Sequence, residues 1–219
     1  MRQATFGKVI FLSDHSPSKD LAEGIEWRKI GRLTSRSDYS SFMLRELVDH
    51  IETSHALCVQ WDGFVLRGAE WDPRFLDYDY VGAIWPQFRD GLNVGNGGFS
   101  LRSRRLLKAC TALPPDRTEA EDILICRIYR RQLEESGICF APEAMARKFS
   151  YERTSPTGKE FGFHGSFNLV RMQPPRQTLE IFHALERHVL SRKERLELLR
   201  WATTRGRARL ALAILNGLI

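Results

Sequence analysis

The order of apolar and polar positions along the chain predicts strands that alternate with helices. Short apolar runs are typical of buried strands, and apolar positions three or four residues apart are typical of helices. Strands that alternate with helices indicate an α/β core. The predicted strands are residues 8–12, 25–30, 55–59, 64–66, 80–84, 99–101 and 138–140, and the predicted helices are residues 38–52, 104–110, 121–135, 142–148 and the stretch from 177 onward.

Serine residues mark where two of these helices begin. Ser35 and Ser37 are candidate N-caps for the helix over residues 38–52, and Ser103 is the candidate N-cap for the helix that ends near Cys110. Because residues 177–219 read as helical throughout, they form an addition to the α/β core. A chain of 219 residues therefore predicts one large domain with a helical appendage.

Composition and charge exclude some classes of protein. Apolar residues make up 42% of the chain and charged residues 27%, which is typical of a soluble globular protein. No apolar run is long enough to span a membrane as a helix. The four cysteines are widely spaced, which predicts reduced thiols and a cytoplasmic location. They are Cys58, Cys110, Cys126 and Cys139.

The basic excess lies at the C-terminal end. Residues 171–219 hold 10 Lys or Arg and 4 Asp or Glu, so they account for the whole net charge of +6. A nucleic-acid-binding protein would spread its basic residues over one binding face, so no nucleic-acid partner is expected. The basic stretch either contacts a membrane surface or an acidic partner, or is an ordinary solvated helical face.

A carboxylate follows the apolar run at residues 55–59. Asp62 belongs to the sequence Gln60-Trp61-Asp62-Gly63. A carboxylate at the C-terminal end of a buried strand faces the ligand crevice in open α/β sheets. Asp-Gly is also a strong signal for a tight turn, and both interpretations stand.

Three later segments carry further candidate chemistry. Three glycines within residues 95–98 indicate either a ligand-facing turn with free backbone amides or a flexible loop. Glu121 and Asp122 open a predicted helix, where carboxylates interact favourably with the helix dipole, and either one is also a candidate general base. His164, between glycine-flanked aromatic residues, is either a buried core histidine or a metal ligand.

Taken in this order, these segments resemble glycosyltransferases of the GT-A fold. They are most similar to an uncharacterised bacterial family of glycosyltransferase-like domains that is often found with polysaccharide genes. The similarity covers about residues 8–168. It rests on residues 59–66 (VQWDGFVL), 71–73 (WDP), 78–83 (YDYVGA), 95–103 (GNGGFSLRS), 121–123 (EDI) and 161–165 (FGFHG).

The resemblance implies a GT-A-like, Rossmann-like mixed sheet flanked by helices. It implies a glycosyltransferase domain over residues 1–170, with the first β-α unit missing, and a basic helical appendage over residues 171–219. It also implies that Asp62 takes the place of the last aspartate of the Asp-x-Asp motif that holds Mn²⁺ or Mg²⁺. Gln60 replaces the first aspartate, which leaves metal independence open, and His164 resembles the histidine that completes the metal shell.

The same resemblance implies the donor site and the base. Asp122 is the first choice for the catalytic base and Glu121 the second. The residues implied in binding the nucleotide-sugar donor are Asp14, Gln60, Trp61, Asp62, Asn96, Gly97, Gly98 and Ser100.

The expected activity is sugar transfer, with inversion, from a nucleotide-sugar to a hydroxyl of a glycan or glycolipid at the cytoplasmic side. The first alternative is a degenerate GT-A module that binds a nucleotide-sugar or glycan without catalysis. The second is an unrelated α/β scaffold, which would leave Asp62 and His164 far apart.

Overall fold

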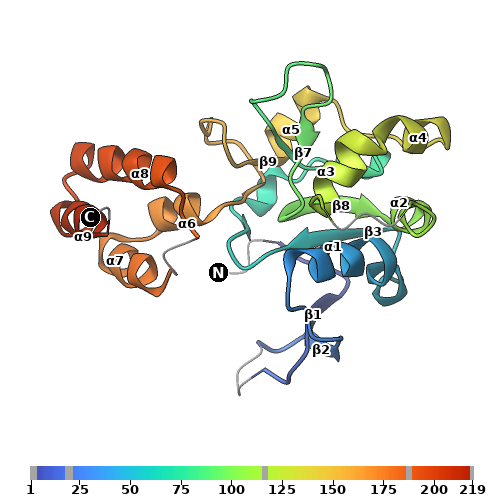
Figure 1. The fold of residues 1–219 in the computed structure, drawn as a ribbon, viewed down its shortest axis with the longest axis horizontal. Coiled ribbons are helices and arrows are strands. Elements are labelled where there is room, and N and C mark those ends of the chain that lie inside the picture. The colour runs from blue at the N-terminus through green and yellow to red at the C-terminus, as the bar shows by residue number, and fades with distance from the viewer. Residues whose placement is uncertain (1–3, 18–21, 115–117, 186–188, 218–219) are drawn as a thin grey trace.

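The chain forms a mixed α/β body with a group of C-terminal helices beside it (Figure 1). The structure is a computed structural model that describes residues 4–17, 22–114, 118–185 and 189–217. The predicted α/β class is therefore confirmed. Within the described residues, no helix has the length and apolar character needed to cross a bilayer.

The strands belong to four small sheets. Strand β3 pairs with β8 in antiparallel register, and β5 lies on the other side of β8. Two parallel pairs, β1 with β2 and β9 with β10, occur in other sheets. The strands are β1 Val9–Ser13, β2 Ile25–Lys29, β3 His55–Val59, β4 Phe64–Val65, β5 Tyr80–Val81, β6 Ala83–Ile84, β7 Val94–Gly95, β8 Phe99–Ser103, β9 Ser150–Tyr151 and β10 Gly162–Phe163.

Helices follow the predicted order, and serine N-caps begin three of them. The hydroxyl of Ser35 accepts a hydrogen bond from the Asp38 backbone N–H, and that of Ser103 accepts one from the Leu106 backbone N–H, so these two predicted caps are confirmed. Ser37, the other candidate, lies inside the helix and is not its cap. The helices are α1 Arg36–Arg45, α2 Arg104–Cys110, α3 Glu121–Ile123, α4 Arg130–Glu135, α5 Glu143–Phe149, α6 Ser166–Met172, α7 Pro175–Ala184, α8 Arg192–Thr204 and α9 Ala208–Asn216.

Several predicted elements differ from those observed. The helix expected over 121–135 is interrupted by a π-helical turn, Leu124–Ile128, and the one over 38–52 ends at Arg45 before a separate 3₁₀ turn. Residues 138–140 form no strand and contribute a single bridge between Phe140 and Tyr80. The short strand β7 was not predicted.

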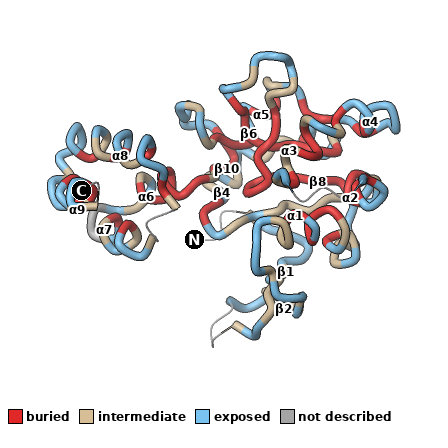
Figure 2. The backbone as a smooth tube through the Cα atoms, in the orientation of Figure 1, coloured by how far each residue is buried: buried red, intermediate tan, exposed pale blue. Residues whose placement is uncertain are grey.

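The first strand is not buried, contrary to its apolar sequence. Within the part of the chain that the structure describes, β1 pairs with β2 alone, and Val9 and Phe11 are 39% and 42% exposed. Figure 2 shows this pair projecting from the body with no buried residue along it. Strand β3 is half-buried rather than buried, and Val59 at its end is 50% exposed.

Aromatic side chains fill the core behind the site. Phe75, Phe99, Phe149 and Phe161 have ring centroids 5.2–6.5 Å apart, and each is 1% exposed or less. Tilted and edge-on ring pairs at these separations are favourable beyond their buried area. This core underlies β8 and so supports the glycine-rich segment that precedes it.

The C-terminal helices have a core of their own. It joins α7, α8 and α9 to Phe167 and Val170 of α6. Helix α6 follows β10 after two residues, so this second core is tied directly to the body. Helix α8 begins with a capping box, in which Ser191 and Glu194 satisfy each other's backbone N–H groups.

One buried carboxylate joins β5 to its neighbours. Asp79 is 5% exposed, and it accepts hydrogen bonds from the Ser103 hydroxyl, the Arg105 guanidinium and the Cys139 backbone N–H. We expect Asp79→Ala to lower the free energy of unfolding by about 3 kcal/mol, because three donors lose a charged acceptor. Urea unfolding monitored by circular dichroism measures this change.

The matched control is Asp77→Ala, since Asp77 is exposed two residues earlier on the same segment. We expect it to change the stability by less than about 0.5 kcal/mol. Equal effects of the two substitutions would contradict the structural role of Asp79.

Candidate functional site

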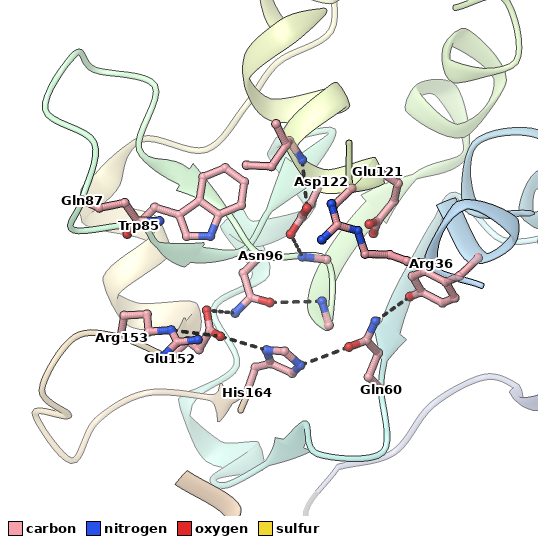
Figure 3. A pocket seen from close by; sticks show the side chains of 15 residues that line it. Arg36, Gln60, Trp85, Gln87, Asn96, Glu121, Asp122, Glu152, Arg153 and His164 are labelled. Carbon is pink, nitrogen blue, oxygen red and sulfur yellow. Dashed lines mark hydrogen bonds and ion pairs between the residues drawn. The ribbon is translucent and has the colours of Figure 1, made fainter. Parts of the chain in front are cut away.

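Segments remote in sequence line a polar cleft of about 320 Å³ (Figure 3). Its walls come from the first turns of α1, the end of β3, the segment before β8, the start of α3 and the ends of β9 and β10. The cleft thus brings together side chains that lie between residues 36 and 164 of the sequence. The polar lining residues are Arg36, Tyr39, Gln60, Gln87, Asn96, Glu121, Asp122, Glu152, Arg153 and His164.

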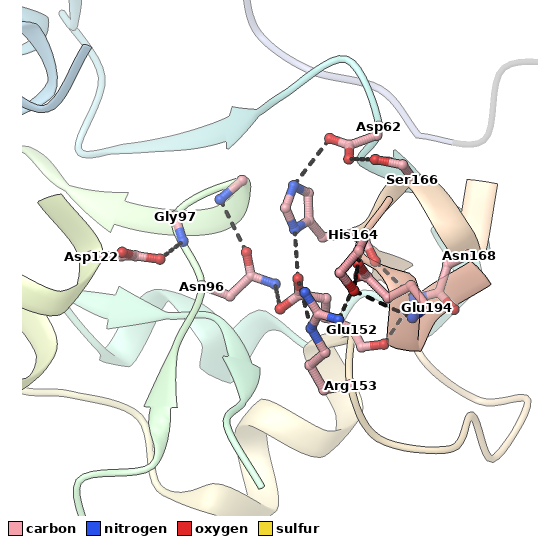
Figure 4. Close-up of polar contacts among 12 residues, drawn as sticks. Asp62, Asn96, Gly97, Asp122, Glu152, Arg153, His164, Ser166, Asn168 and Glu194 are labelled. Atoms are coloured by element: carbon pink, nitrogen blue, oxygen red, sulfur yellow. Dashed lines mark hydrogen bonds and ion pairs between the residues drawn. The ribbon is translucent and has the colours of Figure 1, made fainter. Parts of the chain in front are cut away.

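An imidazole between two carboxylates lies at one side of the cleft (Figure 4). The Nε2 atom of His164 is 3.1 Å from Oδ1 of Asp62, and its Nδ1 atom is 3.6 Å from Oε1 of Glu152. The second distance is that of an ion pair rather than a hydrogen bond. Ser166 donates a 2.8 Å hydrogen bond to the other Asp62 oxygen and so fixes its carboxylate.

Strand pairing explains why these groups meet. Parallel pairing sets Tyr151 opposite Phe163, so the next residues, Glu152 and His164, leave the sheet side by side. Asp62 follows β3 in a tight turn, closed by the Gly63 N–H on the Gln60 carbonyl. The turn interpretation of Asp-Gly is thus correct, but it forms no hairpin, because β4 pairs with β10.

The ring of His164 is held as a cation. Burial by itself would lower the pKa of His164, but the neighbouring Asp62 and Glu152 carboxylates outweigh it and raise the pKa to about 9. The side chain is 14% exposed. The imidazole therefore carries a positive charge at neutral pH.

A metal ion has a partial donor set here. Within the described part of the chain, no three His, Cys, Asp or Glu side chains converge as metal ligands. The amide oxygen of Gln60, however, lies 3.2 Å from Nε2 of His164, close to the 3.1 Å approach of Asp62. Two oxygens and one nitrogen thus gather at one point, and Glu152 takes the place of the carboxylate that often orients a metal-bound imidazole.

The glycine-rich segment packs tightly against the protein itself. A Cβ atom on Gly98 would lie 2.0 Å from Nε2 of His164, and one on Gly97 would lie 2.1 Å from Oε1 of Glu121. The segment is buried, so it is not a flexible loop. The glycines permit close approach of site side chains rather than only of a ligand.

Asn96 adopts a backbone conformation that is rare for a non-glycine residue. Its φ angle is +73°, in the left-handed region. Its side-chain oxygen accepts from the Gly98 N–H, and its amide nitrogen donates to Glu152 at 3.2 Å. A strained residue locked by two side-chain hydrogen bonds beside a cleft is typical of a functional position.

The adjacent carboxylates of α3 have different surroundings. Glu121 is 4% exposed and pairs at 2.7 Å with Arg102, which is itself fully buried. Within residues 4–17, 22–114, 118–185 and 189–217, no cationic side chain pairs with Asp122 in this way. Its two oxygens accept 2.9 Å hydrogen bonds from the Gly97 and Ile123 backbone N–H groups.

This difference controls the protonation of Asp122. Burial, followed by repulsion from Glu121, raises the pKa of Asp122 to about 6. Glu121 keeps its charge in the ion pair with Arg102. Asp122 faces the cleft as a carboxylate of increased basicity. Asp122 is therefore the better placed of the two to take a proton from a bound molecule.

The structure separates the sequence-predicted residues into two sets. Those that line the cleft are Gln60, Asn96, Gly97, Gly98, Glu121, Asp122 and His164, with Asp62 in contact with His164. Three others lie elsewhere. Asp14 pairs with His15 near the projecting β1, Ser100 is buried behind the glycine segment, and Trp61 lines a different groove.

Sequence reasoning missed the charged pair Glu152-Arg153. Both side chains line the cleft, and both directly follow strand β9. Arg153 also pairs at 2.6 Å with Glu194 of α8, so the C-terminal helices reach the rim of the cleft. Arg36, from the first turn of α1, points toward the carboxylates of α3 in Figure 3. Glu152 follows the two-residue strand β9, which the apolar pattern does not predict, so nothing in the sequence singled it out.

Substitutions at the two neighbouring carboxylates should have opposite effects on stability. We expect Glu121→Gln to lower the free energy of unfolding by about 3 kcal/mol, because Arg102 then remains buried without its counter-charge. We expect Asp122→Asn to raise it by about 1 kcal/mol at pH 8, because an unfavourably buried charge is removed.

The gain from Asp122→Asn should shrink toward pH 5. The Asp122 carboxyl group binds its proton more tightly in the folded protein than in the unfolded chain. The wild type therefore loses stability as the pH rises through 6. Chemical denaturation of both variants at pH 5 and pH 8 measures these differences. A large destabilisation by Asp122→Asn at pH 8 would show that Asp122 is structural.

Comparison with known proteins identifies a family but no activity. No curated protein matches the chain, and no solved structure matches it. Residues 25–164, which include Gln60, Asp62, Asn96, Asp122 and His164, match the family described as Protein of unknown function (DUF5672). The matched region is more than half of the chain, so the chain belongs to this family.

Proposed function

We propose that this protein is a GT-A-type glycosyltransferase that moves a sugar from a nucleotide-sugar to a hydroxyl of a glycan or glycolipid. The observation that carries the proposal is the position of Asp122, a buried carboxylate of raised pKa, in one cleft with His164, Gln60 and Asn96. The order of these segments along the chain is also that of the GT-A enzymes that the sequence resembles.

Asp122 acts as the general base in this proposal. One carboxylate oxygen removes the proton from the acceptor hydroxyl while the hydroxyl oxygen attacks the anomeric carbon of the donor. The bond from that carbon to the diphosphate oxygen breaks, and the diphosphate leaves with the electron pair. A single in-line displacement of this kind inverts the anomeric configuration. The hydrogen bonds from Gly97 and Ile123 hold the carboxylate in place for the attack.

The leaving diphosphate needs positive charge that the protein does not supply in excess. We count the described charged side chains that line the cleft, together with those that form an ion pair with a lining residue. Four of them are cationic and five are carboxylates. The cations are Arg36, Arg102, Arg153 and His164, and the carboxylates are Asp62, Glu121, Asp122, Glu152 and Glu194.

A bound Mn²⁺ or Mg²⁺ would balance this charge. Gln60, Asp62 and His164 would hold the ion through the three atoms that already approach one another, with His164 in its neutral form. Diphosphate oxygens and water would complete the shell. When bound, the ion supplies charge stabilisation to the diphosphate.

The non-catalytic alternative rests on Gln60, which replaces an aspartate of the metal motif. In that case the cleft binds a nucleotide-sugar or glycan and no transfer follows. Donor binding without turnover on any acceptor, measured with the same protein sample, would favour this alternative.

The role of Asp122 has a direct kinetic test. We expect Asp122→Asn to reduce kcat by about 10²–10⁴-fold while the donor Kd stays within about twofold, because the base is lost and the donor contacts remain. Calorimetry and a transfer assay with a panel of nucleotide-sugars provide the two measurements. For the wild type, kcat/KM should fall about tenfold per pH unit below pH 6, as Asp122 becomes protonated.

The control for this experiment is Glu119→Gln, since Glu119 is exposed just before α3 and does not line the cleft. It should keep wild-type kinetics. Full activity of Asp122→Asn would exclude Asp122 as the base.

Metal dependence can be tested by binding alone. We expect Mn²⁺ to tighten donor binding by more than about tenfold relative to EDTA in the wild type, because it offsets the negative charge of the cleft. Asp62→Ala should abolish this difference, and Asp49→Ala, at an exposed aspartate of the same body, should retain it. Identical donor affinities in Mn²⁺ and EDTA would make the His164 imidazolium the cation of the site.

A further inference from the structure

We propose that a second groove, lined by Trp61 and Phe64, binds the apolar chain of a lipid-linked acceptor. The inference rests on the proposed function, because it names the acceptor of that reaction. The groove has a volume of about 760 Å³, more than twice that of the cleft. Its lining residues are Trp61, Phe64, Leu169, Gln173, Ile181, Ala184, Leu185 and Val189.

The lining is apolar and open to solvent. Trp61 and Phe64 are 58% and 46% exposed, although side chains of this size are usually covered. No charged side chain belongs to the lining among the described residues, and Gln173 is its only polar one there. An open apolar hollow of this kind is typical of a binding site for an apolar ligand.

The groove and the cleft share a wall. Trp61 lies between Gln60, which lines the cleft, and Asp62, which contacts His164. On the other side, Phe64 stacks on Phe163 with ring centroids 5.8 Å apart, and Phe163 directly precedes His164. A molecule in the groove therefore lies against the same turn that forms the wall of the cleft.

The chemistry of the two cavities selects the occupant. A nucleotide-sugar is polar throughout and gains little from an apolar wall, so it fits the cleft rather than the groove. An acceptor that reaches both cavities needs a hydroxyl at Asp122 and a long apolar chain. Lipid-linked acceptors that carry an anionic group also suit the basic excess of residues 171–219.

Alkyl glycosides of increasing chain length test the groove directly. We expect n-alkyl β-glucosides from hexyl to decyl, kept below their micelle concentrations, to bind the wild type about fourfold more tightly per added methylene, the equivalent of about 0.8 kcal/mol. Calorimetry gives the affinities. The emission of the protein should shift to shorter wavelength as Trp61 is covered, and Trp61→Ala should remove this shift and weaken decyl glucoside binding at least tenfold.

A charge placed in the groove separates it from the cleft. Ala184 is exposed at the end of α7 and lines the groove, so Ala184→Glu should fold normally and lose the dependence on chain length. Gln177→Glu adds the same charge at an exposed position of α7 outside the lining and should behave as the wild type. In a transfer assay, Ala184→Glu should raise KM only for long-chain acceptors and leave donor binding unchanged.

The outcomes distinguish this inference from the proposed function. Transfer with a KM that is independent of chain length would overturn the groove assignment and leave the glycosyltransferase proposal in place. Binding that depends on alkyl chain length, with no transfer to any acceptor, would overturn the proposed function. The alkyl group in the groove would then not belong to an acceptor. A wild-type dimer that Ala184→Glu converts to a monomer in light scattering would assign the groove to a second copy of the chain and overturn the lipid proposal.

Discussion

The site depends on the contact of His164 with carboxylates on both sides. Asp62 reaches it from the turn after β3, and Glu152 from the end of β9, while Ser166 of α6 fixes Asp62. One buried charged ring thus contacts the turn after β3 and the residue after β9, and through Asp62 it is linked to α6. Because a buried charge without a partner is costly, removing either carboxylate affects the position of all of these segments. The glycine at position 98 is a consequence of the same contact, since any side chain there would occupy the space of the ring.

Two adjacent carboxylates at the start of α3 have different roles because their surroundings differ. Glu121 and Asp122 are both carboxylates in a first helical turn, where the helix dipole treats them alike. Only Glu121 has a buried arginine as its partner, and its charge in turn makes proton release from Asp122 harder. The ion pair therefore has two effects, because it holds α3 against β8 and increases the basicity of its neighbour. The π-helical turn that directly follows α3 is a feature often found at functional sites.

Local interactions made part of this structure predictable. The serine caps of α1 and α2 are formed within four residues, and β3 has the predicted bounds, so short-range patterns sufficed for them. The apolar sequence of β1 predicted burial, yet burial depends on the neighbours of a strand, and among the described strands β1 pairs with β2 alone. Glu152 gave no signal of its own, because its position beside His164 depends on the parallel pairing of β9 with β10. The resemblance predicted that the cleft residues would lie together. Nothing in the sequence indicated that Trp61 would point away from them into the second groove.

Residues of the turn after β3 face two cavities of different chemistry, the polar cleft and the apolar groove. Gln60 and Asp62 both approach Nε2 of His164, and Trp61 between them lies in the apolar groove. The turn is fixed on the cleft side by the Gln60 N–H, which donates a 2.8 Å hydrogen bond to the Gly98 carbonyl, and by the Gly63 N–H on Gln60. A ligand that displaced the backbone at Trp61 would also displace Gln60 and Asp62, since a four-residue turn has little freedom of its own. The alternation of polar and apolar side chains in Gln60-Trp61-Asp62 thus places two oxygens beside the imidazole and one indole ring in the groove.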